Sequence, residues 1–370
     1  MNVESIRLIN FRNYTDLSIK LNEKANIFVG RNAQGKTNLL EAIYICATGK
    51  SFRTNRDREL INFNKSEAYI GAKVKVDNRE KIIEIKYDVK GQKRVKVNKI
   101  ELKSYRELDS GLNVVIFSPE DLKLVKGGPI ERRNFLDMSI SQLRPVYKHN
   151  LSRYNKVLFQ RNNLLKSGKN LSEIKSLIDI FDMQLAKIGT EIIISRIDFI
   201  NRLSQIAFNI HSNLTRGKEK ISIEHNSTVD LSIISKNAIE KSFIQQLYSN
   251  REKDLQMGST SIGPHRDDMT IKINGMDART YASQGQQRTI VLTIKLSEME
   301  IIKMESGFYP VLLLDDVFSE LDLDRRSYLI KFLNNLQTII TATDVANIEE
   351  LSNIDKSIFR IENGKIMIKE

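Results

Sequence analysis

Apolar residues follow different spacings in different parts of the chain, and each spacing predicts one kind of element. The first apolar runs are short and predict strands at residues 3–9, 17–21 and 25–29. Between residues 39 and 46 the apolar positions fall three and four apart, as on the buried face of a helix. The spacing then becomes two, with turn residues between the runs, at residues 68–76, 82–89 and 94–97. An antiparallel meander therefore follows a strand–helix unit.

A helical period dominates residues 118–259. Pro145 suits the first turn of a helix, and apolar residues recur at helical spacing after it until Gly168 interrupts the pattern. A second apolar stripe continues from Leu171 to Ile206. We interpret this region as a compact helical lobe, because a long coiled-coil arm needs more heptads than the region holds.

Strand and helix patterns alternate again from residue 260 to the end. A further apolar strand is expected at residues 113–117, and later strands are expected at residues 269–273, 311–314, 337–341, 358–361 and 365–368. Helices are expected at residues 284–303 and 324–333. We predict an α/β protein in which one discontinuous lobe, residues 1–117 and 260–370, carries the helical lobe, residues 118–259, as an insertion.

The first candidate site is the loop between the strand at 25–29 and the helix after it. Its sequence reads G-x-x-x-x-G-K-T, the phosphate-binding pattern, in the strand–loop–helix context that this pattern requires. Its two glycines let the backbone wrap around a triphosphate with N–H groups turned inward, and the new helix adds its positive end. We predict that the loop binds ATP through Gly30, Arg31, Asn32, Ala33, Gln34, Gly35, Lys36 and Thr37.

Two parts of this chemistry concern catalysis and metal binding. Lys36 would reach the β- and γ-phosphates, and the Thr37 hydroxyl would bind Mg²⁺. The apolar strand at 311–314 ends in Asp315-Asp316, as the second magnesium-site strand of P-loop ATPases does. We predict that Asp315 binds Mg²⁺ through water and that Asp316 is the general base for the attacking water.

The stretch Ser283-Gln284-Gly285-Gln286 opens a predicted helix before that strand. Ser283 alone could be an ordinary helix N-cap. However, S-x-G-Q followed by a helix, an aspartate-ending strand and residues 319–322 (SELD) is the order found in ATP-binding-cassette (ABC) ATPases. In that class the S-x-G-Q helix of one subunit contacts the γ-phosphate held by another. We therefore predict that Ser283, Gly285 and Gln286 bind ATP across a dimer seam lined by residues 319–322.

Nearly the whole chain resembles the RecF family of bacterial recombination mediators. The likeness rests on the P-loop, the S-x-G-Q helix start and the segments 8–14 (LINFRNY), 117–122 (FSPEDL), 263–268 (GPHRDD) and 313–322 (LLDDVFSELD). The resemblance implies an ABC-type P-loop ATPase lobe with an inserted, mainly helical lobe. It also implies a weak, DNA-stimulated ATPase that dimerises with ATP on DNA. Such a protein would act with RecO, RecR and RecA in replication, the SOS response and repair of gapped DNA.

Some positions depart from the pattern of membrane-transporter ABC subunits. Those subunits usually carry a glutamine at the start of the helical insertion and a histidine after the last core strand, where this chain has residues 117–120 (FSPE) and 341–344 (TATD). Asp316 replaces their usual glutamate and is one methylene shorter, which predicts the slow turnover of a switch. A transporter ATPase subunit and a short SMC-like clamp are the alternatives. The basic helical lobe weighs against the first, and the lack of room for long arms weighs against the second.

Charge points to a polyanionic partner. The chain has 370 residues with 58 Lys and Arg against 46 Asp and Glu, a net charge of +12. Basic residues concentrate between Glu120 and Lys169, where eleven face four acids. We predict that this cluster contacts DNA phosphates, with Arg153, Lys156 and Arg161 as candidates. Tyr147 and Tyr154 lie in the same region, but their helical spacing predicts core packing.

The remaining composition bears on the compartment. The single cysteine, Cys46, excludes an internal disulfide framework and is expected to be a buried apolar residue of the first helix. The N-terminus lacks the layout of a signal peptide, and no apolar window reaches the length of about 18 residues needed to span a membrane. We therefore expect a cytoplasmic protein with no membrane partner.

Overall fold

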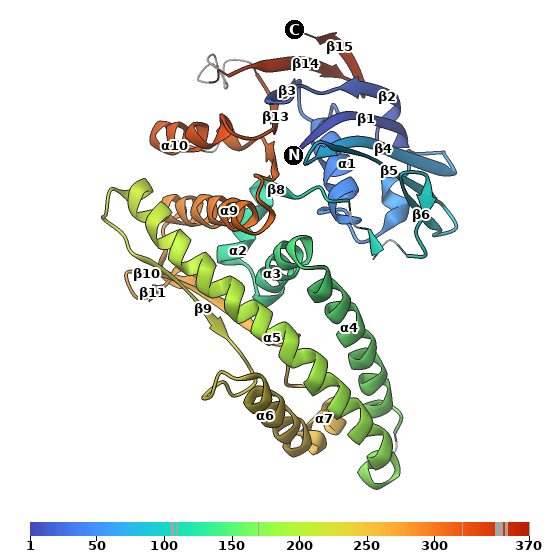
Figure 1. The fold of residues 1–370 in the computed structure, drawn as a ribbon, viewed down its shortest axis with the longest axis vertical. Coiled ribbons are helices and arrows are strands. Elements are labelled where there is room, and N and C mark those ends of the chain that lie inside the picture. Colours follow the sequence, from blue (N-terminus) through green and yellow to red (C-terminus); the bar gives the residue numbers. More distant parts are fainter. Residues whose placement is uncertain are drawn as a thin grey trace. The chain divides into compact units, whose positions relative to one another are not determined.

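The computed structural model describes residues 1–104, 107–108, 110–168, 170–319, 321–344, 351 and 354–369. Two of the residues singled out above, Lys169 and Glu320, lie outside this part of the chain. The chain forms two compact units (Figure 1). Unit 1 comprises Met1–Asp121 and Leu292–Glu370, and unit 2 comprises Leu122–Val291.

The parallel sheet of unit 1 is built from buried apolar strands. Its order is β15-β14-β3-β13-β12-β8, and only the β14–β15 pair is antiparallel among its neighbours. The strands are β3 (Ala25–Val29), β8 (Val114–Phe117), β12 (Val311–Asp315), β13 (Thr338–Ala342), β14 (Lys356–Glu362) and β15 (Lys365–Lys369). Every residue of β3, β8, β12 and β13 is buried, as expected of parallel strands covered on both faces. The predicted apolar runs are thus the core of this unit.

The second sheet of unit 1 is antiparallel, in the order β2-β1-β4-β5-β6-β7. Its strands are β1 (Asn2–Phe11), β2 (Tyr14–Lys20), β4 (Glu67–Val76), β5 (Arg79–Asp88), β6 (Lys93–Val97) and β7 (Ile100–Glu101). The β4–β5 turn has left-handed backbone at Asp77 and Asn78, with φ of 48° and 58°, which is the form that a two-residue hairpin requires. The predicted meander is confirmed, and the two N-terminal strands extend it.

The helices of unit 1 follow the predicted stripes. They are α1 (Lys36–Thr48), α10 (Leu323–Leu333) and the greater part of α9 (Gln284–Ser306), whose first residues belong to unit 2. Short 3₁₀ helices cover Asp57–Leu60, Pro119–Leu122 and Val317–Ser319. Cys46 is buried in α1, as predicted, and burial raises the pKa of its thiol to about 12. A reactive thiolate is therefore disfavoured at this position.

Unit 2 is mainly helical. Its helices are α2 (Lys123–Lys126), α3 (Pro129–Leu143), α4 (Pro145–Leu165), α5 (Leu171–Thr215), α6 (Lys236–Ser249), α7 (Arg251–Met257) and α8 (Ala278–Tyr281). Pro145 starts α4, and the two long helices α4 and α5 pack along one another (Figure 1). Tyr147 and Tyr154 are buried, which confirms their expected place in the core. Among the described residues, none of the helices combines the length and apolar character needed to cross a membrane.

Unit 2 also contains a three-stranded antiparallel sheet, of which the middle strand was predicted at residues 269–273 and the two outer strands were missed. It consists of β9 (Ile221–Asn226), β10 (Asp268–Ile273) and β11 (Met276–Asp277), with β10 in the middle. From the sequence, we expected residues 221–226 in the helical lobe and a return of the chain to the first lobe at residue 260. In the structure, residues 260–291 belong to unit 2 and not to unit 1. The reason is that β10 pairs along its length with β9, which lies in unit 2.

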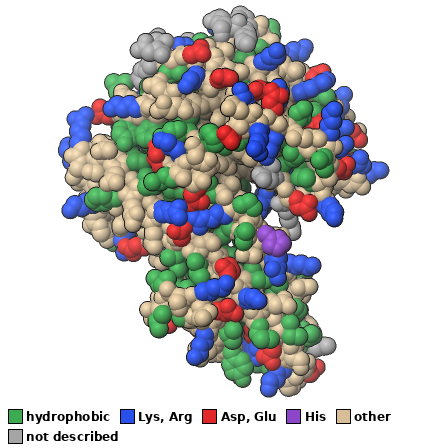
Figure 2. Space-filling view, in the orientation of Figure 1, with side chains coloured by type: hydrophobic (Ala, Val, Ile, Leu, Met, Phe, Trp, Pro, Cys, Tyr) green, Lys and Arg blue, Asp and Glu red, His purple; other side chains and the backbone are tan. Residues whose placement is uncertain are grey.

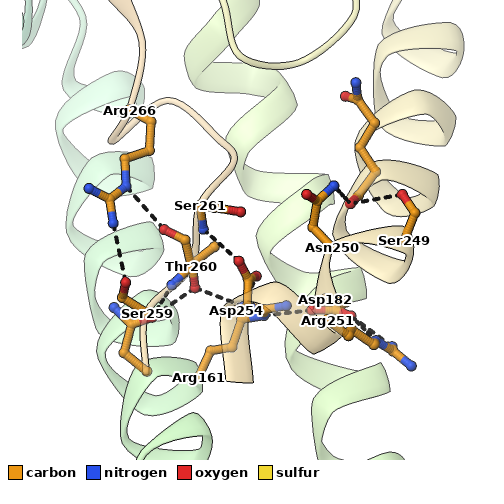
Figure 3. A network of polar contacts seen from close by, with 12 residues as sticks. Arg161, Asp182, Ser249, Asn250, Arg251, Asp254, Ser259, Thr260, Ser261 and Arg266 are labelled. Atoms are coloured by element: carbon orange, nitrogen blue, oxygen red, sulfur yellow. Dashed lines mark hydrogen bonds and ion pairs between the residues drawn. The ribbon is translucent and has the colours of Figure 1, made fainter. Parts of the chain in front are cut away.

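The predicted basic cluster of unit 2 is partly a buried ionic network (Figure 3). Arg161 has no exposed surface and donates from Nε to Asp182 Oδ1 and from Nη1 to Asp254 Oδ2, both at 2.7 Å. Arg251 also binds Asp182, and Thr260 Oγ1 accepts a further bond from Arg161. We call these five residues the Arg161 network. The prediction that Arg161 contacts DNA was wrong, because its charge is neutralised inside the fold.

The segment Gly263–Asp268, which the family resemblance singles out, has a structural role in unit 2. His265 Nδ1 lies 2.8 Å from the Tyr154 hydroxyl, and its Nε2 lies 3.0 Å from the Thr260 carbonyl oxygen. Burial lowers the pKa of His265 to about 4, so the ring is neutral at physiological pH. Asp268 accepts both bonds of a bidentate pair from Arg132. The segment therefore joins α3 and α4 to β10.

Candidate nucleotide-binding site

The loop from Gly30 to Thr37 has the backbone form of an anion-binding nest. Ala33 has a φ of 65° and Gly35 a φ of 115°, so left-handed residues alternate with others through the loop. Left-handed backbone is unfavourable for alanine and is retained where surrounding contacts impose it. Such a conformation suits a loop whose N–H groups are to converge on phosphate oxygens.

Side chains outside the loop hold its carbonyl groups. The Tyr14 hydroxyl donates to the Gly35 carbonyl at 2.9 Å, and Asn13 Nδ2 donates to the Gln34 carbonyl at the same distance. Asn13 Oδ1 in turn accepts from Asn38 Nδ2 of α1 at 2.7 Å. From the sequence, Asn13 and Tyr14 stand out only as part of the family resemblance, which assigns them no role. Both side chains support the loop through its carbonyl groups and leave its N–H groups unused by these contacts.

A partly buried ion pair connects α1 to the β1–β2 connection. Arg12 donates from Nε and Nη2 to the two carboxylate oxygens of Glu41, at 2.9 and 2.7 Å. Glu41 is fully buried and also accepts from the Ser51 hydroxyl at 2.5 Å. A bidentate pair of this kind sets orientation as well as charge. Its place in α1, five residues after Lys36, links the β1–β2 connection to the loop.

Thr37 and Asp315, the two residues predicted to bind Mg²⁺, lie together. The Thr37 hydroxyl donates to Asp315 Oδ1 at 2.8 Å, and the Thr341 hydroxyl donates to the same oxygen, also at 2.8 Å. A hydroxyl and a carboxylate at hydrogen-bond distance form a set of hard oxygen donors of the kind that Mg²⁺ takes in P-loop ATPases. The residues present therefore fit the ion.

Asp316, the predicted base, has strained backbone with a φ of 55°. Its N–H donates to the Thr341 hydroxyl at 3.0 Å. Burial raises the pKa of Asp316, the nearby Lys36 opposes this, and Asp315 adds to it. A raised pKa makes a carboxylate a stronger base while it is still ionised at neutral pH. Thr341 stands in the segment where transporter subunits carry a histidine, and here it orients both aspartates.

Lys36 lies within the same group of charges. Its Nζ donates to the carbonyls of Gly30 and Arg31. Burial lowers the pKa of Lys36, while Asp316 and Asp315 raise it. The loop thus holds the ammonium group through neutral carbonyls, a weaker arrangement than a direct ion pair with a carboxylate.

Ser283 and Gln286, predicted to act across a dimer, form a capping box at the start of α9. Gln286 N–H donates to Ser283 Oγ at 3.3 Å, and Ser283 N–H donates to Gln286 Oε1 at 2.8 Å. Gln286 Nε2 also donates to Glu219 at 2.9 Å. The N-cap interpretation of Ser283 is therefore confirmed. Contact of Ser283, Gly285 and Gln286 with a partner's ATP stays a prediction.

The predicted seam loop has local contacts at both ends. The Ser319 hydroxyl donates to the Asp316 carbonyl at 2.7 Å, and the Asp322 side chain accepts from Arg325 N–H at 3.0 Å to cap α10. The first of these bonds connects the loop directly to the predicted base. Its place at a dimer seam stays a prediction.

Comparison with known proteins gives one family. The family described as "RecF/RecN/SMC N terminal domain" matches residues 2–366. The chain is 48% identical over 367 residues to "DNA replication and repair protein RecF" of Clostridium perfringens (strain SM101 / Type A), with 99% of each covered. It is 40% identical to a solved chain described as "Structure of the recombination mediator protein RecF-ATP in RecFOR pathway", with a TM-score of 0.92 and coverage of 100% and 97%.

A more distant likeness concerns the fold alone. "Crystal structure of the SmcHead bound to the C-winged helix domain of ScpA" matches with a TM-score of 0.58 at 15% identity, covering 100% of this chain and 98% of that one. The predicted α/β architecture, an ABC-type P-loop lobe with an inserted second lobe, is confirmed by these matches. With nearly half of its residues shared along almost its full length, the chain belongs to the RecF family.

Proposed function

We propose that the protein is an ATP-dependent DNA-binding switch of recombinational repair and replication. The observation that carries this proposal is the hydrogen bond from Thr37 to Asp315 beside a nest-shaped P-loop, in a chain that is 48% identical to a RecF protein. The end-to-end likeness to RecF favours this function over a transporter ATPase subunit or an SMC-like clamp.

The residues of unit 1 divide the chemistry among them. The loop from Gly30 to Thr37 binds the phosphates, and Lys36 supplies a positive charge to the β- and γ-phosphates. Thr37 and Asp315 would hold Mg²⁺, which would supply further positive charge to the phosphate oxygens. Asp316 accepts the proton of the attacking water, and Thr341 keeps both aspartates oriented. A short carboxylate on strained backbone suits slow turnover.

The S-x-G-Q helix is proposed to complete the site of a second subunit. Ser283 is exposed, and the capping box with Gln286 fixes it at the N-terminus of a long helix. Such an end attracts anions through its N–H groups and dipole. ATP held by one subunit would then be bridged by Ser283 and Gly285 of the other, so that ATP drives dimer formation.

Unit 2 is the proposed DNA-binding part. It has 26 Lys and Arg against 16 Asp and Glu, so it carries most of the net charge of the chain. On the face shown in Figure 2, Lys and Arg side chains are scattered over the surface. Helix α4 contains no acidic residue, and Arg153 and Lys156 are exposed on one side of it. Phosphate contacts are made mainly by such residues. These two replace the predicted trio that included Arg161.

One experiment tests the switch. Sedimentation and duplex DNA binding are measured with ATP, with ADP and without nucleotide. We expect dimers with ATP alone, and tighter DNA binding in the same condition. Ser283→Arg is the matched variant, because it leaves the P-loop intact and should bind ATP as a monomer. A monomeric wild type in saturating ATP, or a Ser283→Arg variant that dimerises normally, would contradict the proposal.

A further inference from the structure

The turn between β14 and β15 reaches the P-loop. The turn consists of Asn363 and Gly364, both with left-handed backbone at φ of 48° and 72°. Gly364 N–H donates to the Gln34 carbonyl at 3.1 Å, and Asn363 N–H donates to Gln34 Oε1 at 2.6 Å. Both oxygens of one P-loop residue are thus bound by the last hairpin of the chain, far away in sequence.

The contact is too close for side chains. A Cβ on Gly364 would lie 2.6 Å from the Asn13 carbonyl oxygen. A Cβ on Gly30, the first residue of the loop, would lie 2.4 Å from the carbonyl oxygen of Ile361 in β14. Both obstacles are backbone atoms, which cannot swing away as the end of a long side chain can. Gly30 therefore has a second use besides phosphate binding, namely the close approach of β14.

We propose that the β14–β15 hairpin is a clamp that positions the P-loop for phosphate binding, with Asn363 and Gly364 as positioning residues. This proposal rests on the proposed ATP binding. A nest binds anions only if its N–H groups converge, and its carbonyls must then turn outward and find donors elsewhere. The Gln34 carbonyl meets that requirement by accepting from Gly364 N–H and Asn13 Nδ2, and Asn363 N–H holds the Gln34 side chain through Oε1. The hairpin touches the back of the loop and need not touch the nucleotide.

The chain contains a matched control for this contact. The turn between β10 and β11 is also Asn-Gly, and Asn274 and Gly275 have φ of 51° and 82°. A Cβ on Gly275 would meet no atom within 4 Å. Alanine at Gly275 or at Gly364 therefore carries the same backbone strain, but only Gly364→Ala pushes against the atoms that support the P-loop.

The test compares ATP binding by the two full-length variants. The Kd for ATP of Gly364→Ala should rise about fivefold or more, as expected when one or two neutral hydrogen bonds that shape the loop are lost. Gly275→Ala should keep the wild-type Kd, and its Tm should fall by about as much as the Tm of Gly364→Ala, because both alanines carry the same backbone strain. In hydrolysis, Gly364→Ala should raise KM for ATP and leave kcat unchanged, because Asp316 and Thr341 are untouched. Loss of stability alone would move Tm without moving KM.

A second variant covers the case in which Gly364→Ala does not fold. Gln34→Ala keeps both glycines and removes the acceptor of the Asn363 bond, and it should raise the Kd for ATP about threefold. Wild-type Kd in either Gly364→Ala or Gln34→Ala, or an equal rise in Gly275→Ala, would overturn the clamp. Wild-type protein that bound no ATP would instead overturn the proposed function itself.

Discussion

Units 1 and 2 each bury a basic side chain near two aspartates, and they arrange these charges in opposite ways. In unit 2, Arg161 binds Asp182 and Asp254 directly at 2.7 Å. In unit 1, Lys36 bonds to carbonyl groups, and Asp315 accepts from the hydroxyls of two threonines. Buried charges that are paired directly with one another, as in unit 2, connect the elements of the fold. Charges kept apart by neutral partners remain able to act on a ligand.

The comparison shows why residue type alone is a poor guide to function. Arg161 and Arg153 lie eight positions apart on one helix, yet the first is fully buried and the second is exposed. The partners of Arg161 come from α5 and α7, which neither helix spacing nor local charge reveals. The buried and the exposed members of a basic cluster must therefore be told apart before the cluster is assigned to ligand binding.

The largest expected effect is that of Asp316→Asn. The amide nearly matches the size of the carboxylate but is not a base, so ATP should bind normally. Turnover should fall by about 10²- to 10⁴-fold, the usual contribution of a general base. Single-turnover hydrolysis and ATP titration on the same preparation check both parts. Turnover at the wild-type rate would show that Asp316 is not the base.

The rate of ATP hydrolysis should also depend on pH through Asp316. Since burial raises the pKa of Asp316, wild-type hydrolysis should decline as the pH falls through that raised value, at a higher pH than an ordinary aspartate would give. The base is active when ionised, so the rate is lost on the acid side. An acid limb at the position of an unperturbed aspartate would contradict the proposed environment of this carboxylate.

The next effect concerns unit 2. Arg161→Met should destabilise the protein by about 3 to 5 kcal/mol, because the buried carboxylate of Asp254 loses its basic partner and Asp182 keeps only Arg251 of its two arginines. Denaturant unfolding measures the change, and Arg153→Met on the exposed side of the same helix is the control, expected within about 0.5 kcal/mol of wild type. Folded Arg161→Met should still bind ATP. Equal stability of the two variants would refute the distinction between buried and exposed arginines.

The smallest effect is on DNA binding. Arg153→Glu combined with Lys156→Glu should weaken duplex binding and lower the slope of log K against log salt by roughly 0.9 for each lost phosphate contact. The control is Lys241→Glu with Lys253→Glu, an equal charge change at exposed positions of α6 and α7. Equal slopes for the two double variants would mean that α4 has no special part in DNA binding.

The sequence predicts the apolar core and the P-loop chemistry because these depend on local pattern. Buried parallel strands read as apolar runs, and the phosphate loop has a fixed spacing. Strand β9 escaped prediction because it is short, with Ile221 and Ile223 as its buried residues, and its partner β10 begins more than 40 residues later. The contacts of Asn13, Thr341 and Gly364 escaped for the same reason. They join segments that only the tertiary fold brings together.

The central claim is that Lys36 and the loop around it form the ATP-binding site of unit 1. ATP titration of the wild type and of Lys36→Met tests this claim most directly. Methionine keeps the length and apolar body of the side chain and removes its charge. Calorimetry in the presence of Mg²⁺ should show binding by the wild type and none by the variant, while the Tm and the DNA affinity, both measured without nucleotide, stay near wild type. Normal ATP affinity in Lys36→Met would contradict the claim, because the loop would then not be the nucleotide site.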